Sequence, residues 1–250
     1  MMTPLIFITN DDGYYSKGIK ALISVAREVG DVVVVAPMMN SSGLAHSLTS
    51  SRPLRVHTIS DIEGCRIYAC DGTPVDCIKL GVEHFCQRKP DLLLSGINHG
   101  SNSSINVLYS GTMGAAIEGA VMGIPAVGFS LLNHSPEADF GPSLPFVRQI
   151  VGKVLDKRLP EGVALNVNIP DTRGEKINGM RLCRQSKAQW LDSYEKRIDP
   201  QGRPYYWLTG RFECEDVGED TDQWALENGY VSVVPTTTDF TAYEVLREWQ

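Results

Sequence analysis

Short apolar runs alternate with segments of helical periodicity along the first two thirds of the chain. Residues 5–8 form an apolar run of the kind found in buried parallel strands. Apolar positions recur at helical spacing from Ile19 to Ala26, and Ser16 before them is a predicted N-cap. A second apolar run follows at residues 32–35. This strand–helix–strand order predicts a parallel pair joined by a right-handed crossover.

The same alternation continues downstream and defines the fold class. Residues 54–59 and 66–70 indicate a pair of more exposed strands. Further predicted strands cover residues 91–95, 126–129 and 164–168, and predicted helices cover residues 74–86, 110–123 and 144–157. The pattern predicts an α/β protein with a mostly parallel sheet.

The character of the sequence changes after Pro170. Aromatic, charged and turn-rich stretches appear at residues 194–212, and they predict an extended hairpin arm rather than another strand–helix unit. The aromatic run at residues 205–208 needs a covering surface, for which a partner subunit is one candidate. A short helix from Thr221 and a strand at residues 230–234 follow the arm.

Composition narrows the classes of function. The chain has 250 residues, of which 42% are hydrophobic, and this suits one large α/β domain. The formal net charge is -7, so the chain lacks the excess of Lys and Arg that is typical of proteins that bind duplex nucleic acid. No apolar run approaches the roughly 20 residues that cross a bilayer, and no signal-peptide pattern is present. We therefore expect a cytoplasmic protein that does not bind membranes, with its six cysteines reduced.

Polar residues cluster where three of the predicted strands end. The stretches are Asn-Asp-Asp-Gly at residues 10–13, Asn-Ser-Ser-Gly at residues 40–43 and Ser-Gly-Ile-Asn at residues 95–98. The carboxyl ends of neighbouring strands in an open α/β sheet converge on one crevice, where ligands bind. The converging carboxylate, hydroxyl and amide oxygens suit Mg²⁺, Mn²⁺ or Ca²⁺ better than zinc or copper.

The pair Asp11 and Asp12 is the strongest candidate within this set. Asp-Asp-Gly is a common turn composition, and taken alone it indicates a turn more readily than a metal site. Its position after a buried strand changes that balance, because adjacent carboxylates repel each other unless a cation compensates them. Ser42 is weak by itself, whereas Asn98 lies between glycines that allow the backbone to approach a ligand.

A second candidate site is the start of the helix predicted at residues 110–123. Ser110, Gly111 and Thr112 would leave free N–H groups at the positive end of the helix dipole, which suits a phosphate. Ordinary capping by Ser110 is the plain alternative. His46 lies in a crevice loop, where a histidine is usually structural or exposed, yet it could protonate a leaving group.

Several stretches of the chain resemble the SurE family, the stationary-phase survival proteins that act as 5'-nucleotidases. The matching motifs run in the family's order: ITNDDGYYSKGI (residues 8–19), VVAP (34–37), SSGLAHS (41–47), GTPVDC (72–77), SGINHGSN (95–102), YSGTMGAA (109–116) and GYVSVVP (229–235). They span nearly the whole chain, and the ordered set is far more specific than any single motif.

The resemblance implies the composition of the site. One divalent metal ion per subunit, Mg²⁺ or Mn²⁺, would be held by Asp11, Asp12, Ser42 and Asn98. Phosphate contacts would come from Asn102, Ser110, Gly111 and Thr112. Asn40 is a further candidate for substrate contact. Many relatives carry a longer or basic side chain in its loop, so the uncharged loop leaves the substrate preference open.

The resemblance also implies the architecture and the assembly. It predicts one SurE-like domain over residues 1–250, with a Rossmann-like three-layer core at about residues 1–170. The extension, at about residues 171–250, would be exchanged between the subunits of a homodimer or homotetramer. The implied substrates are nucleoside monophosphates cleaved at the 5' position, with activity on the 3' position left open.

The expected reaction is metal-assisted hydrolysis of a phosphomonoester. Asp12 could act as general base or as nucleophile in addition to holding the metal, and the sequence leaves these roles open. A haloacid-dehalogenase-type phosphatase is one alternative, but its D-x-D motif would need the nucleophile where Asn10 stands. The other alternative is a non-enzymatic nucleotide-binding module.

Overall fold

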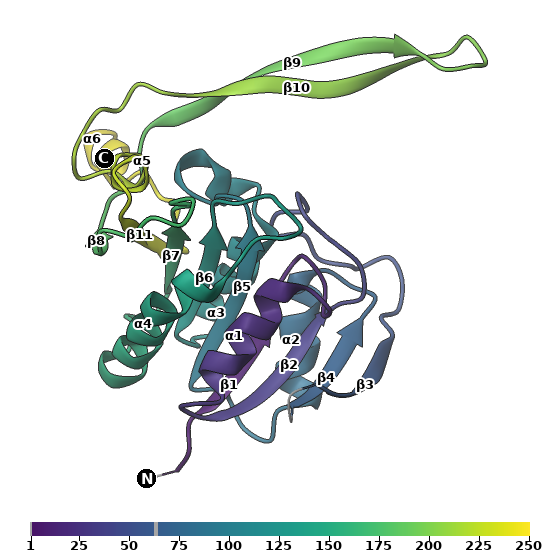
Figure 1. Ribbon diagram of the computed structural model, residues 1–250, viewed down its shortest axis with the longest axis vertical. Helices are drawn as coiled ribbons and strands as arrows, with labels where there is room; N and C mark the ends of the chain where they lie inside the picture. The colour runs from purple at the N-terminus through teal and green to yellow at the C-terminus, as the bar shows by residue number, and fades with distance from the viewer. Residues whose placement is uncertain (1, 63–64) are drawn as a thin grey trace.

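The apolar runs form the middle of a nine-stranded sheet in the computed structural model, which describes residues 2–62 and 65–250 (Figure 1). Its strand order is β3-β4-β2-β1-β5-β6-β7-β11-β8. The strands are β1 (Leu5–Thr9), β2 (Asp31–Pro37), β3 (Val56–Ile62), β4 (Cys65–Cys70), β5 (Leu92–His99), β6 (Ala126–Leu131), β7 (Val163–Ile169), β8 (Met180–Leu182) and β11 (Val231–Thr237). The pairs β3–β4 and β7–β11 are antiparallel, and the other described pairs of this sheet are parallel. The predicted α/β class with a mostly parallel sheet is confirmed.

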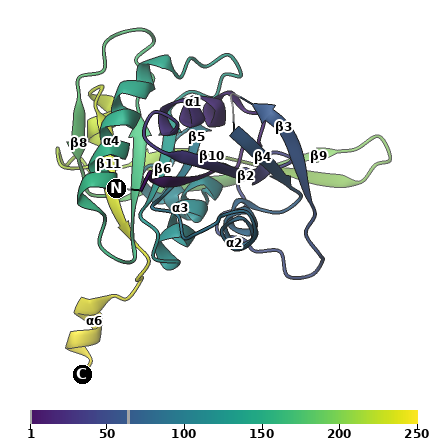
Figure 2. The same cartoon turned by 90° about the horizontal axis from the view of Figure 1, so that it is seen from below.

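Helices cover both faces of the sheet (Figures 1 and 2). One face carries α1 (Lys17–Ala26) and α4 (Leu144–Lys157), and the other carries α2 (Pro74–His84) and α3 (Gly111–Val121). Side chains alternate along a strand, so Ile8 of β1 enters the core under α1 and α4 while Phe7 enters the core under α2 and α3. The described residues also include the short 3₁₀ helices η1 (Ser104–Leu108) and η2 (Gly141–Ser143). Within the described part of the chain, no helix is both long and apolar enough to span a membrane.

Two of the helices that border the candidate site begin at serine caps. Ser16 accepts a hydrogen bond from the N–H of Ile19, and Ser110 accepts one from the N–H of Met113 at 2.9 Å. These bonds satisfy donors that the first turn of a helix otherwise leaves free. The N-cap predicted at Ser16 is confirmed.

The strand β5 is longer than the sequence predicts. The polarity of residues 95–98 indicates a loop, but the chain stays in the sheet as far as His99. Gly96, with a φ angle of +125°, precedes a cis peptide bond, and the register with β6 shifts between Ser95 and Asn98. Because pairing resumes after this shift, Asn98 is held by the sheet rather than by a free loop.

The C-terminal region contributes to the sheet as well as to an arm. β11 pairs antiparallel with β7, and β8 pairs with β11. Helix α5 (Asp222–Glu227) precedes β11, and α6 (Tyr243–Glu248) lies away from the sheet near the C-terminus (Figure 2). The sheet therefore includes two strands from the region after about residue 170 that the sequence assigns to the extension. β8 and α6 are too short to produce a periodic pattern.

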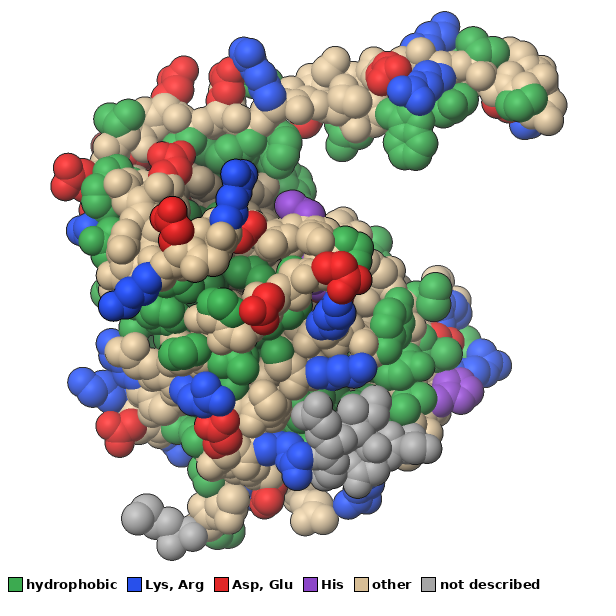
Figure 3. Space-filling view, viewed as in Figure 1, with side chains coloured by type: hydrophobic (Ala, Val, Ile, Leu, Met, Phe, Trp, Pro, Cys, Tyr) green, Lys and Arg blue, Asp and Glu red, His purple; other side chains and the backbone are tan. Residues whose placement is uncertain are grey.

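The strands β9 (Ala188–Ile198) and β10 (Pro204–Cys214) form an antiparallel arm that extends away from the sheet (Figures 1 and 3). Residues with even numbers share one face of this arm and residues with odd numbers share the other. The even face carries Trp190, Tyr194, Ile198, Tyr206, Leu208 and Phe212, together with the charged side chains Asp192 and Lys196. The odd face mixes aromatic side chains with Glu195, Arg197, Arg211 and Glu213. The predicted hairpin arm is confirmed, and its exchange between subunits stays a prediction.

Candidate active site

The carboxyl ends of β2, β1 and β5 meet at one edge of the sheet, and Asp11 and Asp12 follow β1 there. The N–H of Ser41, in the loop after β2, donates to the backbone oxygen of Asp11 at 2.7 Å. The N–H of His99, at the end of β5, donates to the Asp12 carboxylate at 3.3 Å. Segments that are far apart in the sequence therefore converge on the acidic pair.

The first turn of α3 lies against the side chain of Asp11. This side chain is buried, and its carboxylate accepts a hydrogen bond from Thr112 Oγ1 at 2.6 Å. A Cβ atom on Gly111 would lie 2.8 Å from Asp11 Oδ2, so a residue with a side chain does not fit there. The positive end of the α3 dipole consequently faces the carboxylate.

The surroundings of the pair oppose its negative charge. Burial raises the pKa of Asp11 to about 6, the Thr112 hydrogen bond lowers it in part, and the charge of Asp12 raises it again. Burial also raises the pKa of Asp12, against the hydrogen bond from the His99 N–H. Two adjacent carboxyl groups that are both costly to ionise form a site where a cation would be stabilising.

The other predicted metal ligands lie on the two neighbouring loops. Asn98 is buried, and its Nδ2 donates to the Gly100 oxygen at 3.0 Å, which leaves Oδ1 without a donor among the described residues. Ser42 is exposed, one residue after Ser41, and its N–H donates to Asn40 Oδ1 at 2.7 Å. The side-chain oxygen of Asn40 therefore shapes this turn.

The donor set fits a hard cation only when all four residues are counted. Among residues 2–62 and 65–250, no group of three or more His, Cys, Asp or Glu side chains could hold a metal ion. Asp11 and Asp12 would need the oxygens of Ser42 and Asn98 to complete a set of ligands. Carboxylate, hydroxyl and amide oxygens are the ligands that Mg²⁺ and Mn²⁺ prefer. Metal binding by these four residues stays a prediction.

The predicted phosphate cradle is partly engaged within the protein. The Ser110 hydroxyl caps α3, and the Thr112 hydroxyl binds Asp11. The N–H groups of Gly111 and Thr112 belong to the first turn, where no helical acceptor is available, and the Thr112 N–H already faces the Asp11 carboxylate, whose pKa it lowers. An anion at this point would therefore be bound by backbone N–H groups rather than by the hydroxyls.

Asn102 lies in the β5–α3 loop (residues 100–110) and is buried in a polar network. Its N–H donates to Asn168 Oδ1 at 2.8 Å, and its Nδ2 donates to Ser130 Oγ at 2.6 Å. Asn166 Nδ2 donates to the Asn102 oxygen at 2.7 Å. Side chains from β6 and β7 thus fix the backbone of Asn102. The phosphate contact predicted for this residue remains untested.

His46 is paired with a carboxylate that the sequence does not single out. Its Nε2 lies 2.8 Å from Glu118 Oε2, and Lys79 Nζ lies 2.6 Å from Glu118 Oε1. Glu118 lies two turns along α3, so the ring of His46 faces away from the first turn of that helix. The pair ties the loop after β2 to α3, and a role for His46 as general acid stays a prediction.

Three further polar side chains lie at this edge: Asn10 and Ser95 belong to the predicted polar stretches but have no predicted role, and Thr9 lies outside those stretches. Thr9 Oγ1, Asn10 Oδ1 and Ser95 Oγ are buried without a hydrogen-bond partner among the described residues. Thr9 and Ser95 lie opposite each other on β1 and β5. Unpartnered buried polar atoms indicate places where water or a ligand completes the bonding. The available signal, a polar residue at the end of an apolar run, is equally typical of a turn.

Comparison with known proteins identifies the family. Residues 6–192 match the family model described as Survival protein SurE. The chain belongs to the SurE family. This SurE chain is 51% identical to the 5'-nucleotidase SurE of Flavobacterium psychrophilum, over 99% of this chain and 96% of the relative. It is 53% identical to the 5'-nucleotidase SurE of Flavobacterium johnsoniae, over 98% and 95%.

A solved structure shows the same fold. The crystal structure of the SurE protein from Aquifex aeolicus has a TM-score of 0.84 to this chain at 42% identity, and the match covers 98% of both chains. The resemblance drawn from the ordered motifs is therefore confirmed. Membership of the SurE family replaces the haloacid-dehalogenase-type alternative.

We predict that Asp11 makes the metal-free protein less stable as pH rises. Its pKa is about 6 in the folded protein against an ordinary value of 3.8, so the folded state binds more protons in this interval. The contribution of Asp11 to the free energy of unfolding is full below about pH 4 and is lost as pH rises through about 6. The loss amounts to about 3 kcal/mol.

Urea unfolding in EDTA at several pH values checks this prediction. The wild type should lose this stability between pH 4 and pH 7, whereas Asp11→Asn should not lose it, because the amide does not ionise. The difference between the two proteins removes the effect of the other titrating groups. Parallel pH profiles for the two proteins would contradict the prediction.

Proposed function

We propose that this SurE-family protein is a metal-dependent phosphomonoester hydrolase that dephosphorylates nucleoside monophosphates at the 5' position. The observation that carries the proposal is the burial of Asp11, beside Asp12, against the first turn of α3. One site then combines a place for a cation with a helix start suited to phosphate. The two relatives at 51% and 53% identity, both named 5'-nucleotidase SurE, support the same activity.

One Mg²⁺ or Mn²⁺ ion per subunit would be held by oxygen atoms of Asp11, Asp12, Ser42 and Asn98. The raised pKa values of the two aspartates fit this role, because a cation would offset both their burial and their mutual repulsion. When bound, the ion would supply positive charge against the phosphate and help to orient it for attack.

The protein's own residues would bind the phosphate and accept the proton of the attacking water. The Gly111 N–H and the positive end of the α3 dipole would stabilise phosphate oxygens as the bond to the leaving group breaks. The Thr112 hydroxyl orients Asp11, so it acts on the carboxylate rather than on the phosphate. Asp12, which is partly exposed, would either accept a proton from the attacking water or attack phosphorus itself.

We predict that the purified protein releases phosphate from nucleoside 5'-monophosphates only when a divalent ion is present. EDTA should abolish the release, and added Mn²⁺ or Mg²⁺ should restore it. The substrates tested should include nucleoside 3'-monophosphates, because the family resemblance leaves activity on the 3' position open. If no monophosphate is hydrolysed with either metal, the non-enzymatic nucleotide-binding alternative replaces the proposal.

The cytoplasmic location proposed with this activity is tested separately by cell fractionation.

We predict that Asp12→Asn lowers turnover by at least about 100-fold, because it removes both a charge and a base from the site. Metal content measured on the same preparation separates the two roles. Full metal occupancy with lost turnover assigns Asp12 a chemical role, whereas lost metal assigns it the role of a ligand only. Asp156→Asn, an exposed aspartate on α4, is the matched control and should retain full activity. An active Asp12→Asn protein would contradict the proposal.

We further propose that the arm formed by β9 and β10 joins subunits into a homodimer or homotetramer through exchange of this C-terminal segment. The even face of the arm supports this, because Tyr194 and Leu208 lie opposite each other and are 66% and 61% exposed. Exposed apolar side chains of this kind are typical of a surface that another protein surface covers, because contact removes their apolar area from water.

We predict that Leu208→Asp shifts the protein toward the monomer, because the charge would be buried in the proposed contact. Ser193→Asp places the same charge on the odd face of the arm and serves as the matched control. Size-exclusion chromatography with light scattering measures both masses. A monomeric wild type, or equal behaviour of the two variants, would overturn the proposed assembly.

A further inference from the structure

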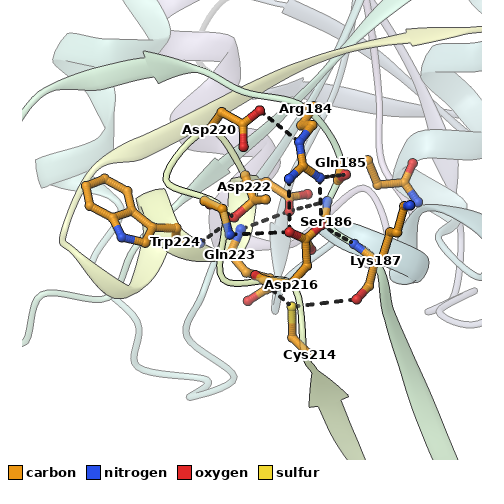
Figure 4. Close-up of polar contacts among 12 residues, drawn as sticks. Arg184, Gln185, Ser186, Lys187, Cys214, Asp216, Asp220, Asp222, Gln223 and Trp224 are labelled. Atoms are coloured by element: carbon orange, nitrogen blue, oxygen red, sulfur yellow. Dashed lines mark hydrogen bonds and ion pairs between the residues drawn. The ribbon is translucent and has the colours of Figure 1, made fainter.

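The buried carboxylate of Asp222 joins three separate segments, and its contacts within the C-terminal region are drawn in Figure 4. Asp222 is the first residue of α5 and is fully buried. Its Oδ1 accepts the N–H of Ser186 at 3.0 Å and that of Gln223 at 2.8 Å. Its Oδ2 accepts the N–H of Ser104, in the β5–α3 loop, at 2.7 Å. One side chain thus connects α5, the segment before β9 and the loop beside the acidic pair.

The same part of the β5–α3 loop has two more bonds to the C-terminal region. Gln223 Nε2 donates to Ser103 Oγ at 2.7 Å, and Ser104 Oγ donates to the backbone oxygen of Ser186 at 3.0 Å. Ser104 has a φ angle of +54°, a conformation that residues with side chains rarely adopt. The surrounding bonds therefore impose a backbone shape that the loop would not favour alone.

The opposite side of the loop is held by the sheet. Asn102 is bound by side chains of β6 and β7, whereas Ser103 and Ser104 are bound by α5. The loop begins just after the end of β5, which carries Asn98, a proposed metal ligand, and it ends at Ser110, the cap of α3. Its position between the metal site and the phosphate cradle is thus fixed from two sides.

We propose that Asp222 is a positioning residue for phosphate binding, an inference that rests on the proposed function. The residue touches no reacting atom. Its carboxylate compensates a buried backbone N–H of the β5–α3 loop and so holds that loop in the shape that presents Asn102 and the first turn of α3 to the substrate phosphate. Loss of this bond leaves the Ser104 N–H buried and unpaired, and the loop moves to reach water.

The substitution Asp222→Asn affects the loop selectively. An amide has one acceptor oxygen, and the Oδ1 position serves two N–H groups while the Oδ2 position serves one. The side chain keeps more bonds when its oxygen occupies the Oδ1 position. Its NH₂ group then points at the Ser104 N–H, donor against donor. The bond to the loop is broken and the bonds within the C-terminal region are kept.

Asp220→Asn is the matched control. Asp220 belongs to the same cluster, where its carboxylate accepts from Arg184 Nε at 2.8 Å, and its side chain is 67% exposed (Figure 4). The contact is confined to the C-terminal region. The control therefore makes the same chemical change on the outer side of the cluster and leaves the bond to the loop intact.

The experiment measures steady-state kinetics on AMP with Mn²⁺, inhibition by inorganic phosphate, and thermal unfolding. We expect Asp222→Asn to raise the KM for AMP and the Ki for phosphate about 10-fold, as loss of one charged hydrogen bond implies, with kcat within about twofold. Asp220→Asn should leave all three constants unchanged. A lower kcat and melting temperature with unchanged KM and Ki would assign Asp222 a purely structural role and overturn the proposal.

Two further measurements keep the outcome decisive. If Asp222→Asn does not fold, Gln223→Leu removes only the bond to Ser103 and should raise KM and Ki about threefold; unchanged constants overturn the proposal. If the wild type hydrolyses no monophosphate, the proposed function fails, and amide hydrogen exchange in residues 101–109 still tests the positioning role. Faster exchange in Asp222→Asn than in Asp220→Asn supports it, and equal exchange overturns it.

Discussion

The arrangement of the site depends on one contact, the Asp11 carboxylate against the first turn of α3. A helix N-terminus stabilises a nearby anion by about 0.3–2 kcal/mol, and the Thr112 hydrogen bond adds a comparable amount. Removing a carboxylate from water costs several kcal/mol, so these two interactions do not balance the burial. The raised pKa of Asp11 reflects that deficit. The ionised form of Asp11 is therefore under-stabilised in the folded protein, and the cation proposed above would supply the missing stabilisation.

Polar side chains fix much of the irregular backbone near the site, in addition to the packing of Val107 into the core. Ser130, Asn166 and Asn168 point from β6 and β7 to the β5–α3 loop, and Asp222 binds it from α5. Apolar contacts fill volume but do not fix the direction of an N–H or C=O group. Hydrogen bonds do fix it, so the backbone of this segment is held in one place beside the acidic pair.

The sequence predicts most of the helices and strands, because their apolar residues recur in regular patterns. It predicts few of the polar contacts between these elements. The bounds of α4 agree to the residue, because its periodicity and its flanking residues are both clear. The acidic pair stood out because charge after an apolar strand is costly. The partner of His46 did not stand out, because Glu118 is 72 residues away and lies in a helix of small residues. Asp222 and Ser104 are 118 residues apart, and no local pattern connects them.

The place of β11 in the sheet has a consequence for how the chain is made. β11 closes the edge of β7, yet about 60 residues separate the two strands in the sequence, and the whole arm lies between them. At about 5–20 residues per second, several seconds of synthesis pass with that edge unpaired and the arm already complete. An open strand edge pairs readily with another chain. Chains made side by side on one message would therefore each expose the open edge of β7 before β11 has been synthesised.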